Sequence, residues 1–171
     1  VTSADEVKRL KRRIAHMARQ VCNERQAELP RFEVGAMIES PKACLNAGKI
    51  AEHCDFILIG TTDLTISTFA IHRDDAGRYL PLYLEQGILD ADPFVELDDS
   101  SVGELIRIAV DRARRARPGI RIGLGGGHSN DASTVRWCIK NGIDYITCDP
   151  HRLPMNRLAA AQAAIKDVIT T

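Results

Sequence analysis

The sequence predicts an α/β fold with a parallel sheet. Apolar runs of strand length alternate with amphipathic stretches of helical spacing, and this alternation implies right-handed crossovers between parallel strands. One run, "CDFILIG" (54–60), is almost continuously apolar, as in strands that a parallel sheet buries on both faces. The 171 residues hold about four βα units, whereas a closed (β/α)₈ barrel takes about 250 residues. The patterns alone therefore favour either an open doubly wound sheet or half of a barrel.

The expected elements follow one another from the amino terminus. Ser3 and Glu6 form a capping box before a helix of about five turns. The run "VGAMI" (34–38) is a strand that ends at Glu39, and a Ser-Pro pair then opens the next helix. The later elements are the strand at 54–60, a short helix, a long loop insert at about 72–102, a helix capped by Ser101 and Glu104, the strand at 120–125, a helix at 133–142, the strand at 144–148 and a final helix that carries Leu158, Ala161, Ile165 and Val168.

Composition indicates one globular domain over residues 1–171. The 23 basic and 23 acidic side chains cancel, so nothing predicts a nucleic-acid partner, and the dense basic run at 112–117 is expected to be a solvated helix face. No apolar stretch approaches the roughly 20 residues that cross a bilayer. The five cysteines are odd in number and lack metal-ligand spacing, which is typical of reduced thiols in a cytoplasmic protein.

Polar residues follow the strands at four places, which a parallel sheet brings to one rim. Glu39 follows one strand and Asp63 lies just beyond the next. Two carboxylates on neighbouring strand ends suit Mg²⁺, which prefers oxygen ligands and keeps several waters. The alternative is structural: Asp63 caps the helix after it, and Glu39 pairs with a lysine or an arginine.

Several motifs then point to a family. "VGAMIESPKA", "DFILIGTTDLT", "RDDAGRYLPLYLEQGILDADPF", "GLGGGHSND" and "DYITCDPHRLPMNRLAAAQAA" together resemble the carboxyl-terminal PEP/pyruvate domain of the pyruvate phosphate dikinases, within the PEP-utilising enzymes. The resemblance runs from near residue 1 to about residue 165, with the motifs in family order. It implies the carboxyl-terminal half of a (β/α)₈ barrel that binds Mg²⁺ and PEP or pyruvate and exchanges a phosphoryl group with a phosphohistidine on a separate domain.

The resemblance also assigns roles to individual residues. It makes Glu39 and Asp63 the metal ligands, and it brings Gly60, Thr61 and Thr62 into contact with the substrate. The family's catalytic cysteine, which donates a proton to the enolate carbon, corresponds to Gly125. A glycine has no group that could carry out this acid/base step.

Other departures accompany the lost thiol. Gly127 stands where the family has a glutamate, Thr62 stands where it has an asparagine, and neither the amino-terminal half of the barrel nor a phosphohistidine motif is present. The opening at Val1, directly before a helix cap, suggests that the sequence starts inside a longer protein. His128 and Cys148 are candidates for a replacement acid/base group, with a loop-orienting histidine and an inert buried thiol as the structural alternatives.

Two further features carry open alternatives. The glycines at 125–127 could instead cradle an anion at the start of a helix near Asn130. The insert lies over the barrel mouth in the family, but in a half barrel it could cover a sheet edge, through Tyr79, Leu80, Tyr83 and Leu84.

The sequence thus supports two hypotheses about function. The first is a Mg²⁺-dependent domain that binds PEP, pyruvate or a similar 2-oxo acid and is degenerate for ordinary phosphotransfer. The second is a non-catalytic half barrel, which has open sheet edges and is therefore expected to form a homo-oligomer or to associate with a complementary half-barrel chain.

Overall fold

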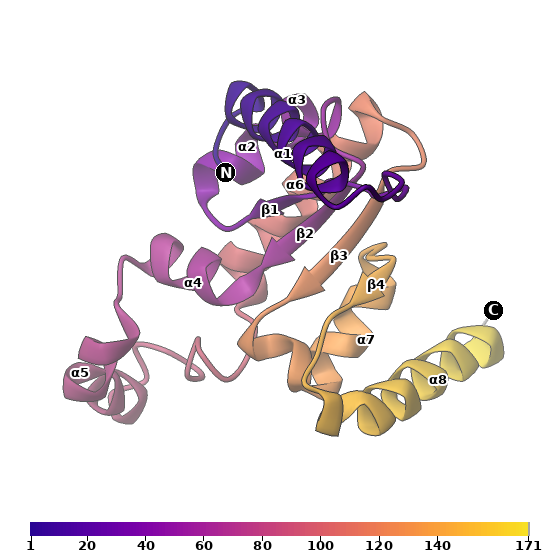
Figure 1. Ribbon diagram of the computed structural model, residues 1–171. Coiled ribbons are helices and arrows are strands. Elements are labelled where there is room, and N and C mark those ends of the chain that lie inside the picture. Colours follow the sequence, from indigo (N-terminus) through magenta and orange to yellow (C-terminus); the bar gives the residue numbers. More distant parts are fainter. Residues whose placement is uncertain (171) are drawn as a thin grey trace.

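The computed structural model describes residues 1–170 and confirms the α/β class. Four parallel strands form one sheet in the order β1-β2-β3-β4 (Figure 1). The strands are β1 (Ala36–Ile38), β2 (Phe56–Gly60), β3 (Arg121–Gly125) and β4 (Tyr145–Ile146). All three strand pairs are parallel, and their register aligns the carboxyl ends of the strands at one edge.

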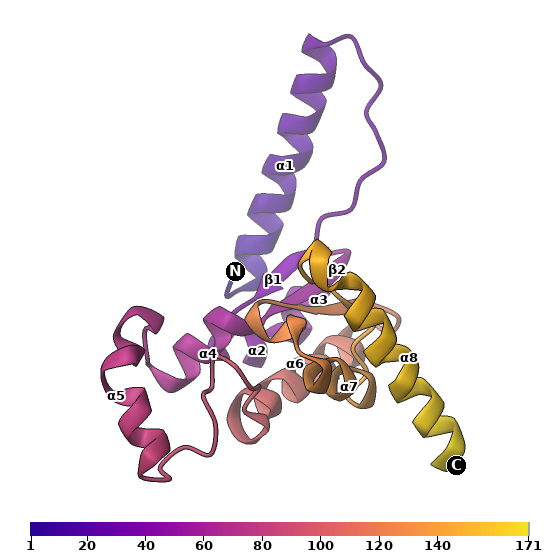
Figure 2. The ribbon, with the colours of Figure 1, turned by 90° about the horizontal axis from the view of Figure 1, so that it is seen from below.

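Helices connect the strands, as the sequence predicts. Their bounds are α1 (Ala4–Glu24), α2 (Pro41–Leu45), α3 (Ala47–Ala51), α4 (Thr61–Phe69), α5 (Arg73–Glu85), α6 (Glu104–Ala116), α7 (Ala132–Lys140) and α8 (Leu153–Thr170), with a π-helical turn at Asp99–Gly103 and 3₁₀ turns at Gly127–Asn130 and Pro150–Arg152. Helices α1, α5 and α8 project from the body in different directions (Figure 2). The capping box at the start of α1 is confirmed, and Ser40 caps α2 with Pro41 in its first turn.

The core lies between one face of the sheet and the helices α2, α3 and α6. Alternate strand residues point into it, among them Ile38, Ile59 and Leu124, which are fully buried. Burying apolar surface is the main favourable contribution to folding, so this layer stabilises the sheet. Helix α1 adds only Val7 to the core.

On the opposite face of the sheet, within residues 1–170, side chains of the strands themselves cover the backbone. Glycines on this face are covered by side chains from the neighbouring strand, which lie so close that an added Cβ would fall under 3.0 Å from them. The Tyr145 ring covers Gly123 in this way, and its hydroxyl donates a hydrogen bond across the sheet to the Ile57 carbonyl (3.0 Å). The other pairs are Phe56 over Gly35, Glu39 over Gly60 and Thr147 over Gly125.

The insert at about 72–102 is not a simple loop, which corrects the prediction. It contains the 13-residue helix α5, on which Ala76 and Leu80 are buried. Leu80 therefore makes apolar contact as expected, whereas Tyr83 and Leu84 stay partly exposed. The predicted cap at Ser101 is also wrong, because the Asp98 carboxylate accepts the Ser101 amide (2.8 Å) and begins the π-helical turn before α6.

The basic run on α6 is solvated only in part: Arg112 and Arg115 are exposed, whereas Arg114 and Arg117 are half-buried. Arg112 donates to the Leu45 carbonyl, Arg117 donates to the Cys54 carbonyl, and Arg114 bonds Asp144 (2.9 Å). Only Arg115 pairs within its own helix, with Asp111. These arginines therefore attach α6 to neighbouring segments.

All five cysteines are free thiols, as their number and spacing predict. Within residues 1–170, no helix is long and apolar enough to cross a membrane.

Candidate functional site

The predicted site residues lie at the carboxyl ends of the strands. Glu39 directly follows β1, Gly60 ends β2 and Gly125 ends β3. The register pairs Gly60 with Gly125, and Thr147 continues the same row beyond β4, where its amide bonds the Leu124 carbonyl (2.9 Å). The sheet thus brings together residues that lie far apart in the sequence.

Glu39 and Asp63 form a carboxylate pair at this rim. Asp63 is exposed in the first turn of α4, and Glu39 is half-buried beside it. Burial, followed by the hydrogen bond and the negative charge of Asp63, raises the pKa of Glu39 above its usual range. These causes disfavour the charged form, and the positive charge of the amino terminus opposes them only in part. Two carboxyl groups that disfavour each other's ionisation therefore lie side by side at this rim.

The structure does not support the structural interpretations of these carboxylates. Gly60 precedes α4 without any side-chain cap, so Asp63 is not the cap of this helix. Among the described side chains, no lysine, arginine or histidine lies within 4.0 Å of the Glu39 carboxylate. An added Cβ at Gly60 would lie 2.8 Å from Glu39 Cγ, so the glycine makes room for this carboxylate to lie over β2.

The pair fits a hard divalent cation. Two carboxylates with like charge gain from a dication between them, and Mg²⁺ usually takes one or two carboxylates and keeps several waters. No set of three or more His, Cys, Asp and Glu side chains gathers around one point in the described part of the chain. Water and a bound ligand would therefore complete the coordination.

The hydroxyls of Thr61 and Thr62 form hydrogen bonds within the protein. Thr61 is fully buried, and its hydroxyl lies 3.1 Å from the Gly125 carbonyl. The Thr62 hydroxyl accepts the Gly127 amide (2.9 Å). These bonds attach the glycine loop to α4, while the uncapped first turn of α4 leaves its amides without a side-chain acceptor.

His128 lies beneath the rim. It is 1% exposed, and its Nε2 donates to the Pro93 carbonyl (2.8 Å), because a carbonyl can only accept. Its Nδ1 lies 2.9 Å from the Thr61 hydroxyl. Both ring nitrogens are therefore engaged by the protein, which favours the loop-orienting interpretation over that of a proton donor.

The glycine loop offers little to a free anion at the start of α7. The Asp131 carboxylate already accepts the amides of Ser133 (2.9 Å) and Thr134 (3.0 Å), so a carboxylate of the protein occupies this helix end. Asn130 instead donates to Asp149 (2.9 Å) and joins the loop to the segment after β4. The physical condition for the anion hypothesis, free amides at this helix start, is thus not met.

A cavity of about 400 Å³ adjoins the glycine loop. The loop lines one side, and the other side is formed by the segment after β4, in which Cys148 is half-buried. Thr147 also lines this cavity, although only the neighbouring Cys148 was a candidate site residue from the sequence. The signal for Thr147 is its register, because it continues the row that Gly60 and Gly125 form.

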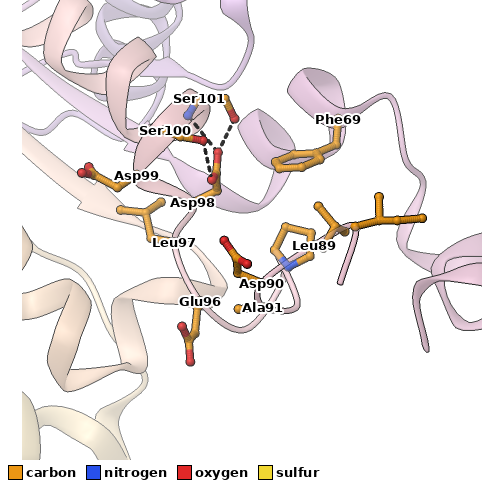
Figure 3. Close-up of a pocket in the computed structure, with 12 residues that line it drawn as sticks. Phe69, Leu89, Asp90, Ala91, Glu96, Leu97, Asp98, Asp99, Ser100 and Ser101 are labelled. Atoms are coloured by element: carbon orange, nitrogen blue, oxygen red, sulfur yellow. Dashed lines mark hydrogen bonds between the residues drawn. The ribbon is translucent and has the colours of Figure 1, made fainter. Parts of the chain in front are cut away.

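A second cavity of about 400 Å³ lies in the insert, apart from the predicted site residues (Figure 3). Its wall carries several carboxylates, and the Asp98 carboxylate accepts the hydroxyl of Ser100 (2.8 Å) and that of Ser101. Asp98 therefore serves the turn that begins α6 and does not face the cavity as a free ligand.

Comparison with known proteins agrees with this geometry. A family described as "PEP-utilising enzyme, PEP-binding domain" matches residues 1–165. The chain is 46% identical over 160 residues to pyruvate, phosphate dikinase of Rhizobium meliloti (strain 1021), covering 94% of the chain and 18% of that relative. It is 43% identical over 162 residues to the enzyme of Clostridium symbiosum, covering 95% of the chain and 18% of the relative. It is 45% identical over 152 residues to pyruvate, phosphate dikinase 2 of Zea mays, covering 87% and 17%.

The chain therefore spans less than a fifth of the length of these relatives. The match nevertheless covers nearly all of the chain, and four parallel strands joined by helices are what a partial (β/α) barrel requires. The chain belongs to the PEP-utilising enzymes, within their PEP-binding domain.

Proposed function

We propose that the rim binds Mg²⁺ and PEP, pyruvate or a similar 2-oxo acid. The observation that carries this proposal is the Glu39–Asp63 pair, whose negative charge lacks a compensating cation among the described side chains. Glu39 and Asp63 would hold the ion, and Thr62 would adjoin the ligand at the start of α4. Gly60 and Thr61, which the resemblance also assigns to the substrate, are buried and would support the site from beneath. Bound Mg²⁺ would stabilise negative charge on the enolate oxygen of such a ligand.

The same site is degenerate for ordinary phosphotransfer in this proposal. Gly125 has no group that can move a proton, and both nitrogens of His128 are already engaged. Cys148 is a half-buried thiol for which a structural role suffices. The residues thus support binding of an enolate-like ligand without an evident acid/base group. The five free thiols suit a reducing compartment, and we place the protein in the cytoplasm.

Calorimetric titration with oxalate, a stable mimic of the pyruvate enolate, tests the proposal. Binding should require Mg²⁺ or Mn²⁺, and Glu39→Ala should abolish it. Glu52→Ala is the matched control, because Glu52 is an exposed carboxylate near only His53 (3.9 Å). Absence of metal-dependent binding at millimolar oxalate in the wild-type chain would refute the proposal.

Helix α1 favours a second candidate function, self-association. Its apolar residues Val7, Leu10, Ile14, Met17 and Val21 recur at alternating spacings of three and four, the a/d pattern of a helix-packing seam. All of them except Val7 are between 42% and 46% exposed. An apolar seam of this length is typical of a helix that packs against a partner.

Charge suggests what that partner is. Helix α1 carries six lysines and arginines against three carboxylates, so two copies of α1 would repel each other. The insert at 72–102 has the opposite balance, eight carboxylates against two arginines, and it exposes Leu82, Ile88 and Val95. We therefore propose that α1 of each copy packs on the acidic insert of a second copy.

Light scattering coupled to gel filtration tests this second candidate. A dimer should form at micromolar concentration, weaken as salt rises, and dissociate in Leu10→Ser/Ile14→Ser. The matched control is Asn23→Ser, which changes an exposed, uncharged residue of the same helix outside the seam. A wild-type mass of one chain at all concentrations would contradict self-association.

A further inference from the structure

Thr147 occupies the space that a side chain at position 125 would need. A Cβ added at Gly125 would lie under 3.0 Å from Thr147 Oγ1, but 3.7 Å from Thr147 Cβ, which is ordinary contact. The conflict is therefore with the hydroxyl alone. Thr147 is exposed, so its hydroxyl faces solvent, and in the described part of the chain it has no protein hydrogen-bond partner, although the amide of the same residue bonds the Leu124 carbonyl.

A second glycine at the rim is covered by a neighbouring side chain in the same way. Glu39 lies over Gly60 and Thr147 lies over Gly125, while the two glycines are direct neighbours in the register. Adjacent strands are about 4.8 Å apart, and the two glycines carry no side chains of their own, so we take the strip of rim between Glu39 and Thr147 as the seat of a small ligand. A carboxylate lies on one side of this seat and a free hydroxyl on the other.

We propose that Thr147 determines which ligand this seat accepts. Its hydroxyl can donate to an acceptor oxygen of the ligand, but it gains nothing from a methyl group. In this proposal the end of the ligand next to Thr147 is the one that is oxygen in oxalate and a methyl group in pyruvate, so Thr147 favours oxalate-like dianions over pyruvate. The inference rests on the proposed function for the ligand, while the placement of Thr147 over Gly125 is independent of it.

The first experiment tests whether Thr147 lies over Gly125, and it needs no ligand. Gly125→Ala should lower the midpoint of thermal unfolding by roughly 5 °C, because the new Cβ meets the Thr147 hydroxyl. In a Thr147→Ala background the same substitution should cause no loss or a small gain, because alanine restricts the unfolded chain more than glycine does. Gly77→Ala, where nothing lies within 4 Å of the added Cβ, is the matched glycine control.

The second arm measures ligand choice. Thr147→Val keeps the shape of the side chain and removes its hydroxyl. Affinity for oxalate in the presence of Mn²⁺ should fall about tenfold, while affinity for pyruvate should stay unchanged. Thr68→Val is the control, since the Thr68 hydroxyl bonds only the Leu64 carbonyl of its own helix (2.6 Å).

The outcomes separate the two proposals. Equal effects of Gly125→Ala in both backgrounds would overturn the placement of Thr147, whatever the ligand result. An equal loss of both ligands, or no loss of either, in Thr147→Val would overturn its role in selection while metal-dependent binding stands. If the wild-type chain binds neither ligand, the proposed function fails, and the selective role of Thr147 fails with it.

Discussion

Replacing Glu39 by glutamine should change stability in opposite directions with and without metal. Glutamine keeps the size of the side chain and removes one of two neighbouring negative charges. Without a cation, the charged form of Glu39 is disfavoured by burial and by Asp63, which is why its pKa is raised. A raised carboxyl pKa means that the fold loses stability as the pH rises through that pKa, so at neutral pH the variant should be the more stable protein.

The magnitudes follow from exposure and mass action. Glu39 is half-buried, so screening limits the gain to about 0.5 kcal/mol, or a rise of about 1 to 2 °C for a domain of this size. At about 10 mM Mg²⁺ and a dissociation constant of about 1 mM, binding stabilises the wild-type chain by about 1.4 kcal/mol, or about 3 to 6 °C. The variant should show none of this increase.

Differential scanning calorimetry at neutral pH, with and without Mg²⁺, measures both effects. Glu52→Gln is the control and should show the wild-type response to the metal. The reasoning is wrong if Glu39→Gln is less stable than the wild-type chain without metal, or if it keeps the full increase with Mg²⁺.

Three other predictions concern single residues. Gly126→Ala should lower the free energy of unfolding by about 2 kcal/mol, because Gly126 has a φ of +107° and an added Cβ would lie 2.7 Å from Thr61 Oγ1. Urea unfolding measures this, with Gly127→Ala as the control, which should be near neutral because its added Cβ has its nearest contact at 3.5 Å. A hydrogen bond from Lys11 lowers the pKa of Asp55, so this carboxylate stabilises the fold above its unfolded pKa of about 3.9, and the stabilisation is lost as the pH falls below that value. Asp55→Asn should therefore reduce the fall in the free energy of unfolding at acid pH, and an unchanged fall would contradict this. Burial raises the pKa of the Cys44 and Cys138 thiols to about 12, so a thiol reagent should label both only at the rate of unfolding, and fast labelling of the folded chain would disprove their burial.

Local signals made much of the fold predictable. The cap at Ser3 and the Ser-Pro start of α2 depend on residues within one helical turn, so the sequence contains all the information for them. Helix α5 was missed because Gly77 and Pro81 disfavour a helix locally. The burial of Ala76 and Leu80 outweighs that preference, and burial depends on distant parts of the chain.

The contrast between local and distant information also explains which parts of the candidate site could be predicted. Glu39 and Asp63 could be predicted because each follows a recognisable strand, and parallel strands end at one rim. The engagement of His128 could not be predicted, because its partner Pro93 lies 35 residues away in the insert. Thr147 was missed for a similar reason, since only the register of β3 and β4 places it beside Gly125.

The pairing of glycines with overlying side chains also constrains how this rim can evolve. A cysteine at position 125 would meet the Thr147 hydroxyl where it now lies, so a thiol there requires the Thr147 side chain to turn or to be replaced. The two positions are therefore coupled: which residues are tolerated at position 125 depends on the residue at position 147.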